Sequence, residues 1–289
     1  DELMPALQEQ FDWQTVTASD PKFQYPGPIY YYLTEGVHEV TLTLREEAFA
    51  LQSFTFSNQE GAKPYAEVKA AWDAAGARDT SGINLRFEAE KSYLKNDVTL
   101  FATYDTAYEH ITPSSPVNIF YNTIGKNTWK EIGQEITWEF EVPESGYYNL
   151  AFKAKQYDKN NAFSGRRVTI DGNPVARETE VQKFEYGTSW YVKVLSDDSG
   201  QPLPVYLEAG RHVLGLTACT DEETAALLRD VSATQKELQH WYREIIRITG
   251  FNADAGRITI DANREFDLEK DIPGLFEGLR KNTEELEEE

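Results

Sequence analysis

Apolar and polar residues alternate along several short segments in the middle of the chain. The clearest segment is 135–142, where Ile136, Trp138, Phe140 and Val142 are separated by polar residues. A period of two is typical of strands that bury one face. We predict strands at 85–89, 117–121, 135–142, 147–155, 167–170, 191–195, 205–207 and 212–218. Many short strands separated by turn signals such as Asp171-Gly172-Asn173 predict a mainly β fold, a jelly-roll β-sandwich over 83–220.

A similar alternation occurs earlier in the chain, at 40–44 and 51–56. Leu33-x-x-Gly36-x-His38-x-Val40-x-Leu42 aligns with Leu207-x-x-Gly210-x-His212-x-Leu214-x-Leu216, which indicates a weak internal repeat. Two or three strands do not make a stable sandwich alone. We therefore predict that 1–60 holds the C-terminal strands of a partial second sandwich, which either lacks its other strands or pairs with the sheet that follows.

Helical periodicity marks two other regions. Apolar residues at i, i+3, i+7 and i+10 predict a short helix over 64–76, and we interpret 61–82 as a helix and linker. From 221 to 249 apolar residues keep helical spacing up to Gly250, and a second helix is predicted over 272–289. We therefore expect a helical C-terminal extension over 221–289, ending in an acidic tail.

The charge of the chain restricts its partners. The net charge is −21, so phosphate backbones and anionic membrane surfaces are repelled, and we expect no nucleic acid partner. The negative charge does not disfavour neutral ligands such as sugars. No run approaches the roughly 18 apolar residues of a membrane span, so we expect no membrane span in this chain. Cys219 is the single cysteine and does not settle the compartment.

The central segment resembles carbohydrate-binding modules of families 6 and 35, which have a galactose-binding-like jelly-roll fold. Five pieces appear in the order of those families. They are Phe87-Glu88-Ala89-Glu90, the run from Gly133 to Leu150, Arg167-Val168-Thr169-Ile170-Asp171-Gly172, Gly187-Thr188-Ser189-Trp190 and the run from Leu207 to Leu214. The resemblance implies a non-catalytic module that binds oligo- or polysaccharide.

A second resemblance covers more of the chain. Asn122-Thr123-Ile124-Gly125, the run from Phe184 to Trp190, the run from Trp241 to Gly250 and the run from Leu268 to Pro273 are similar to the N-terminal region of Firmicutes extracellular solute-binding proteins of sugar ABC importers. This implies an extracellular or cell-surface lipoprotein, accessory to an importer. It also implies an ABC permease as a partner through a solute-binding domain outside this chain. No signal peptide is visible, and we expect that the export signal has been removed.

The candidate sugar-binding residues combine aromatic faces for sugar rings with polar groups for hydroxyls. Family 6 modules place a ligand-stacking tryptophan where Trp190 lies, in a Gly-Thr-Ser-Trp loop. Packing beneath their own loops is the alternative role for each candidate. The candidates are Trp190, Tyr186, Tyr121, Asn122, Asn127, Trp129 and Arg166.

Metal and catalytic sites have weaker signals. Glu88 and Glu90 resemble the start of the structural calcium site of those modules, but the closing-strand aspartate of the family is missing after His212. No phosphate loop, HExxH, paired cysteines or GxSxG is present, so we expect that the chain is not an enzyme. Two alternatives to a sugar-binding module that is accessory to an importer remain open. One is a structural spacer or protein-docking platform, and the other is the accessory module of a glycoside hydrolase.

Overall fold

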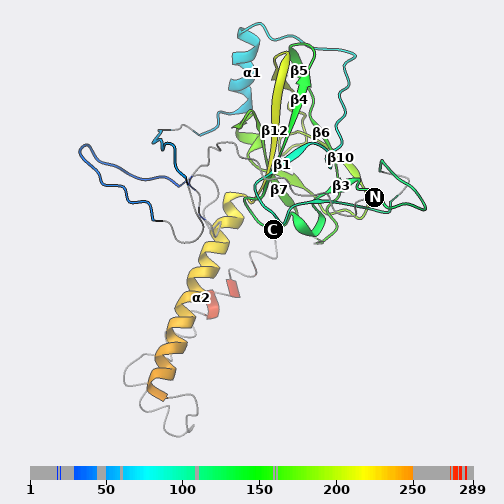
Figure 1. The fold of residues 1–289 in the computed structure, drawn as a ribbon. Coiled ribbons are helices and arrows are strands. Elements are labelled where there is room, and N and C mark those ends of the chain that lie inside the picture. The colour runs from blue at the N-terminus through cyan, green and yellow to red at the C-terminus, as the bar shows by residue number, and fades with distance from the viewer. Residues whose placement is uncertain are drawn as a thin grey trace.

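The computed structural model describes residues 18, 20, 29–43, 50–58, 61–107, 111–158, 160, 162–249, 274, 276–278, 280, 281 and 284. Figure 1 shows a β-rich body with one short and one long helix attached to it. The helices are α1 (Tyr65–Ala74) and α2 (Glu222–Thr249), with two short 3-10 turns, η1 (Lys126–Thr128) and η2 (Arg177–Thr179). The strands are β1 (Tyr93–Lys95), β2 (Ala102–Thr103), β3 (Thr123–Ile124), β4 (Glu135–Val142), β5 (Gly146–Tyr148), β6 (Ala151–Ala154), β7 (Ser164–Ile170), β8 (Asn173–Pro174), β9 (Gln182–Phe184), β10 (Tyr191–Val194), β11 (Val205–Leu207) and β12 (Gly210–Cys219).

The largest sheet has the order β1-β4-β12-β7-β8, and β9 also pairs with β7. Its central pairings are antiparallel, with Leu214 opposite Trp138 in β4 and opposite Ile170 in β7. The alternation that predicted β4 is visible in its burial, because Ile136 and Val142 are fully buried while Glu139 and Glu141 are exposed. The mainly β prediction is therefore confirmed.

The second layer consists of short antiparallel pairs, β10-β6, β11-β5 and β2-β3. The apolar core joins residues of both layers: Ile136, Trp138, Val168 and Leu216 come from the large sheet, and Leu195, Leu203, Val205 and Leu207 from the β10–β11 region. The core therefore lies between two layers, as in the predicted sandwich.

The sequence placed most central strands correctly but missed where strands change partner. The predicted strand 147–155 is divided into β5, which pairs with β11, and β6, which pairs with β10. The predicted strands 85–89 and 117–121 are not formed, since neither segment has a paired neighbour. Their apolar residues remain outside the core, with Phe87 56% and Val117 85% exposed.

Helix α1 and the segment after it pack on the outside of β5 and β11. Trp72 contacts the rings of Tyr147 and Tyr206, with centroids 6.1 and 6.4 Å away. The Tyr147 hydroxyl donates to Asp73 over 2.7 Å, and the Tyr147 backbone N–H donates to the Arg78 carbonyl. Residues 61–82 were predicted to be a helix and linker. The helix is confirmed, but the following residues form part of the sandwich surface.

The predicted strands of a partial second sandwich are not formed in the described residues 29–43 and 50–58, which carry no strand. Val40, Leu42 and Phe54 are 48%, 63% and 64% exposed. Alternation alone does not make a strand, because an apolar face is stabilised only when another layer covers it. Residue 44, the last of the segment 40–44, lies outside the described residues.

Helix α2 confirms the predicted C-terminal helix and extends from the sandwich (Figure 1). Asp221 caps its first turn by accepting from the Thr224 N–H over 2.9 Å, and also pairs with Lys183 over 3.1 Å. The described residues between 274 and 284 are helical, as predicted for 272–289. Within the described residues, no helix combines the length and apolar character that a membrane crossing requires.

Candidate functional site

Three loops meet at one end of the sandwich, where β6 ends and β7 and β10 begin. They run from β2 to β3, from β6 to β7 and from β9 to β10. We call the described residues 104–107, 113–122, 155–158 and 185–190 the loop face. Loops at the end of a rigid sandwich are the usual place for binding residues, because the strands fix where each loop begins and ends.

A mostly buried ion pair links the first two loops. Lys155 Nζ lies 3.4 Å from Asp105 Oδ2, and their side chains are only 18% and 10% exposed. Burial alone would raise the pKa of Asp105. The Ala107 N–H, which donates to its carboxylate, and the Lys155 ammonium outweigh burial and hold the pKa below its usual range. The Asp105 carboxylate is therefore charged and fixed at neutral pH.

Backbone contacts join the third loop to the second. Gln156 and Tyr186 form a parallel bridge, and the Gly187 N–H donates to the Gln156 carbonyl over 2.6 Å. Trp190 directly precedes β10 and Lys155 directly follows β6, and these two strands pair with Tyr191 opposite Ala154. Trp190 and Lys155 therefore lie at the same end of one strand pair.

Three tyrosines around the ion pair expose their rings. Tyr104, Tyr157 and Tyr186 are 43%, 41% and 37% exposed. The Lys155 ammonium lies 5.0 Å from the centre of the Tyr157 ring, and that of Lys126 lies 5.2 Å from the centre of the Tyr104 ring. Each of these two rings is thus held in place by a cation while part of its surface faces solvent. A small hollow beside Tyr104 is lined by Asp105, Asn118 and Phe120, among other residues.

The predicted residues Trp190 and Tyr186 lie on the loop face, as does Tyr121. Trp190 is half-buried, and its Nε1 is buried without a hydrogen-bond partner among the described residues. The Tyr121 hydroxyl is also buried without a partner among them. Buried polar groups normally have partners, so a buried water is the expected partner of each of these two atoms.

Asn122 was predicted to contact a ligand, but its side chain is used inside the protein. Its Oδ1 accepts from the Asp105 N–H over 2.9 Å, and its Nδ2 donates to the carbonyls of Asp105 and Pro113. Asn122 is only 8% exposed. Asn122 thus fixes the loop that carries Asp105. This corresponds to the alternative role given above, packing beneath its own loop.

Trp129 and Arg166, two of the predicted ligand contacts, pack against each other. The Arg166 guanidinium lies 4.3 Å from the centre of the Trp129 ring and donates to the Trp129 carbonyl, while Trp129 Nε1 donates to the Gln134 carbonyl. Burial lowers the pKa of Arg166 to about 10, which still leaves it charged at neutral pH. Asn127 is exposed on η1 beside this pair.

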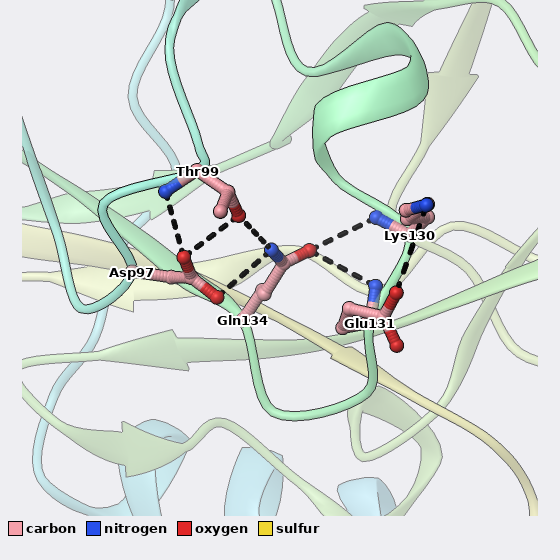
Figure 2. A network of polar contacts seen from close by, with 5 residues as sticks. All are labelled: Asp97, Thr99, Lys130, Glu131 and Gln134. Carbon is pink, nitrogen blue, oxygen red and sulfur yellow. Dashed lines mark hydrogen bonds and ion pairs between the residues drawn. The ribbon is translucent and has the colours of Figure 1, made fainter.

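A buried glutamine fixes the loop that carries η1 and Trp129, as Figure 2 shows. Gln134 Nε2 donates to Asp97 Oδ2 and Thr99 Oγ1, and its Oε1 accepts from the N–H groups of Lys130 and Glu131, all within 3.0 Å. The Thr99 hydroxyl is the main cause that lowers the pKa of Asp97. Each residue of this network already has hydrogen-bond partners within the protein, so the network stabilises the fold of the loop.

The residues resembling a calcium site do not assemble one. Glu88 forms an ion pair with Arg86 over 3.0 Å. Glu90 is 9% exposed, and its Oε1 is buried without a partner among the described residues. Burial is the main cause that raises the pKa of Glu90. Among the described residues no three His, Cys, Asp or Glu side chains form a group that could hold a metal, whereas Ca²⁺ takes about 6–8 oxygen ligands.

The sequence did not point to Tyr104, Asp105, Lys155 or Tyr157. The available signal for Tyr157 was an aromatic residue two positions after the end of the predicted strand 147–155. Asp105 and Lys155 are 50 residues apart in the chain, and only the folded loops bring them together.

Comparison with known proteins gives matches among solved structures only. No protein-family model matches the chain, and no curated protein matches it. A family 35 carbohydrate-binding module from Clostridium thermocellum is 21% identical, with a TM-score of 0.35, over 47% of this chain and 87% of that one. A CBM35 from Paenibacillus barcinonensis is 18% identical, with a TM-score of 0.31, over 47% of this chain and 88% of that one.

A longer enzyme is also among the matches. The Podospora anserina GH26-CBM35 β-(1,4)-mannanase is 16% identical, with a TM-score of 0.29, over 57% of this chain and 39% of that one. Similarity this low does not by itself place the chain in the family of any of these proteins.

Proposed function

We propose that this chain is a non-catalytic carbohydrate-binding module that binds neutral oligo- or polysaccharide at the loop face. The observation that carries the proposal is the set of exposed rings of Tyr104, Tyr157 and Tyr186 around the Asp105–Lys155 ion pair. Tyrosine rings stack against the C–H face of a sugar, and the Asp105–Lys155 ion pair fixes the loops that carry these rings. The sequence motifs shared with families 6 and 35 support the same ligand class.

The predicted residues have two different roles in this proposal. Tyr186 supplies an exposed ring, and Trp190 and Tyr121 each place on the loop face a side chain whose buried polar atom lacks a protein partner among the described residues. Asn122, Trp129 and Arg166 position the loops, since their polar groups already have protein partners. Asn127 remains a contact candidate on the exposed side of η1.

In this proposal the module lies outside the cell and is accessory to the solute-binding protein of a sugar ABC importer. The motifs from Asn122 to Gly125 and from Trp241 to Gly250 support this setting. An ABC permease would then be reached through a domain other than the sandwich. A weak affinity is expected, because a shallow surface with few stacking rings offsets little of the cost of association.

A glycan array with the purified chain tests the proposal. We expect binding to neutral glycans that is lost in the double variant Tyr157→Ala/Tyr186→Ala. The matched control is Tyr242→Ala, which removes a tyrosine that is 62% exposed on α2, outside the loop face. Equal binding by both variants would reject the site. A blank array from the folded chain would reject sugar binding and favour the docking-platform alternative.

A further inference from the structure

His212 lies at the other end of the sandwich, near the start of β12, where the turns after β7 and β11 meet. Its Nδ1 is 2.7 Å from Asp171 Oδ2, and its Nε2 is 2.8 Å from the Glu208 carbonyl oxygen. The His212 side chain is 13% exposed. Carbonyl oxygens only accept hydrogen bonds, and so do ionised carboxylates. Both ring nitrogens of His212 therefore face acceptors.

We propose that His212 is a proton-dependent latch that joins the β7–β8 turn to the β11–β12 corner when both of its ring nitrogens carry protons. A neutral imidazole has a single N–H and satisfies one of the two acceptors. The imidazolium satisfies both and adds the attraction between its charge and the Asp171 carboxylate. Loss of one proton therefore removes one of the two hydrogen bonds that the His212 ring makes at this end of the sandwich.

The surroundings of the ring favour the charged form. Phe140 of β4 packs against His212, with ring centroids 5.8 Å apart, and carries no charge. The ionisable groups that act on the ring are Asp171, from the β7–β8 turn, and Glu208, from the β11–β12 corner. Burial alone would lower the pKa of His212, but the Asp171 carboxylate and the Glu208 carbonyl outweigh it, so the pKa is raised.

Asp171 is held in place independently of the histidine. Its φ is +52°, in the left-handed region, and its Oδ1 accepts from the Val213 N–H over 2.8 Å. The Asp171 N–H donates to the Val213 carbonyl over the same distance. The carboxylate oxygen opposite His212 is thus presented by the turn itself, and the latch is preorganised.

His38 provides a natural comparison within the same chain. His38 Nε2 is 2.7 Å from the carbonyl oxygen of Thr34. Thr34 lies four residues before His38, just as Glu208 lies four residues before His212. Gly36 and Gly210, two residues before each histidine, have φ values of +140° and +133°. The glycine turn and the contact from histidine to a carbonyl oxygen therefore occur twice in the chain. Within the described residues, however, no carboxylate bonds to His38 Nδ1.

The sign of the pH effect follows from the raised pKa. The stabilisation by His212 is fully present below about pH 6.5, the pKa of an unfolded histidine, and is lost as the pH rises through the folded-state value. Each unit by which the folded pKa exceeds the unfolded one changes the unfolding constant about tenfold. The latch thus tightens in acid and loosens as the pH rises through the raised pKa of His212.

The variant Asp171→Asn separates the latch from ordinary packing. Asparagine tolerates the left-handed backbone and its Oδ1 still accepts from Val213, while its amide N–H donates to a neutral His212 Nδ1. We expect urea unfolding from pH 5 to pH 9 to show a stability loss in the wild type that Asp171→Asn lacks. His38→Gln is the control and should keep the wild-type profile.

A spectroscopic readout covers the case in which a variant folds poorly. Nitrogen-15 spectra of the wild-type imidazole rings recorded from pH 5 to pH 9 should show that the His212 ring loses its second proton at a pH above about 6.5, the pKa of an unfolded histidine. A midpoint at or below about 6.5 would overturn the latch. Parallel stability profiles of wild type and Asp171→Asn would overturn it too, because the two proteins differ only in the group opposite Nδ1.

Discussion

Replacing Gly146 by alanine tests whether the segment after α1 is part of the sandwich. A methyl group at this position would lie 2.4 Å from Thr80 Cγ2 and 2.7 Å from the Arg78 carbonyl oxygen. The second neighbour is backbone, so it cannot rotate away as a side chain can. Residues 78–80 must therefore move away from β5, or β5 must shift relative to its partner strand β11.

The cost follows from the contacts that such a movement breaks. The Tyr147 N–H donates to the Arg78 carbonyl over 3.0 Å, and the Thr80 hydroxyl donates to the Tyr147 carbonyl over 2.8 Å. Overpacking of this kind costs about 1–3 kcal/mol. With a urea m-value of about 2 kcal/mol/M, the unfolding midpoint should fall by about 0.5–1.5 M.

Urea unfolding followed by tryptophan fluorescence measures this midpoint, and hydrogen exchange at the Tyr147 amide reports the local contact. Gly61→Ala is the control, since nothing lies within 4 Å of the added methyl group. We expect the control to change the free energy of unfolding by less than about 0.5 kcal/mol. Equal midpoints for the two variants would refute the packing of residues 78–80 on β5.

Three further substitutions test the site and its support. Gln134→Leu should lower the free energy of unfolding by about 2–4 kcal/mol in urea melts, because it leaves buried partners unsatisfied. Asp105→Asn should cost about 1–3 kcal/mol at pH 7 but little at acid pH. The wild-type contribution of the depressed Asp105 pKa is lost as pH falls through that pKa, so urea melts at several pH values should converge. Trp72→Ala should cost about 2 kcal/mol in urea melts and expose α1 amides to exchange, whereas unchanged exchange would contradict its docking on Tyr147 and Tyr206.

Much of the sandwich could be predicted because its central strands bury one face. The alternation at 135–142 coincides with β4, and the predictions near 205–207 and 212–218 coincide with or lie inside β11 and β12. The segments 85–89 and 117–121 have similar alternation but no partner strand. Periodicity reports which face of a segment is apolar, and pairing depends on chain segments far away in sequence.

The candidate site could be predicted only in part, for a related reason. Trp190 and Tyr186 lie in a motif that a resemblance identifies, and the structure places both on the loop face where we propose that sugar binds. Asn122 and Arg166 have the residue types of a sugar site, but their polar groups are already bonded within the protein. Whether a polar side chain is free depends on loop conformation, which composition does not encode.

The central claim is that the loop face binds neutral sugar, and an NMR titration tests it most directly. The nitrogen-15-labelled chain would be titrated with neutral oligosaccharides of glucose, galactose, mannose and xylose at millimolar concentration. We predict that at least one series shifts the amides of 104–107, 155–158 and 185–190, while the amides of α1 stay unchanged. Shifts confined to other surfaces, or no shifts with any series, would contradict the claim.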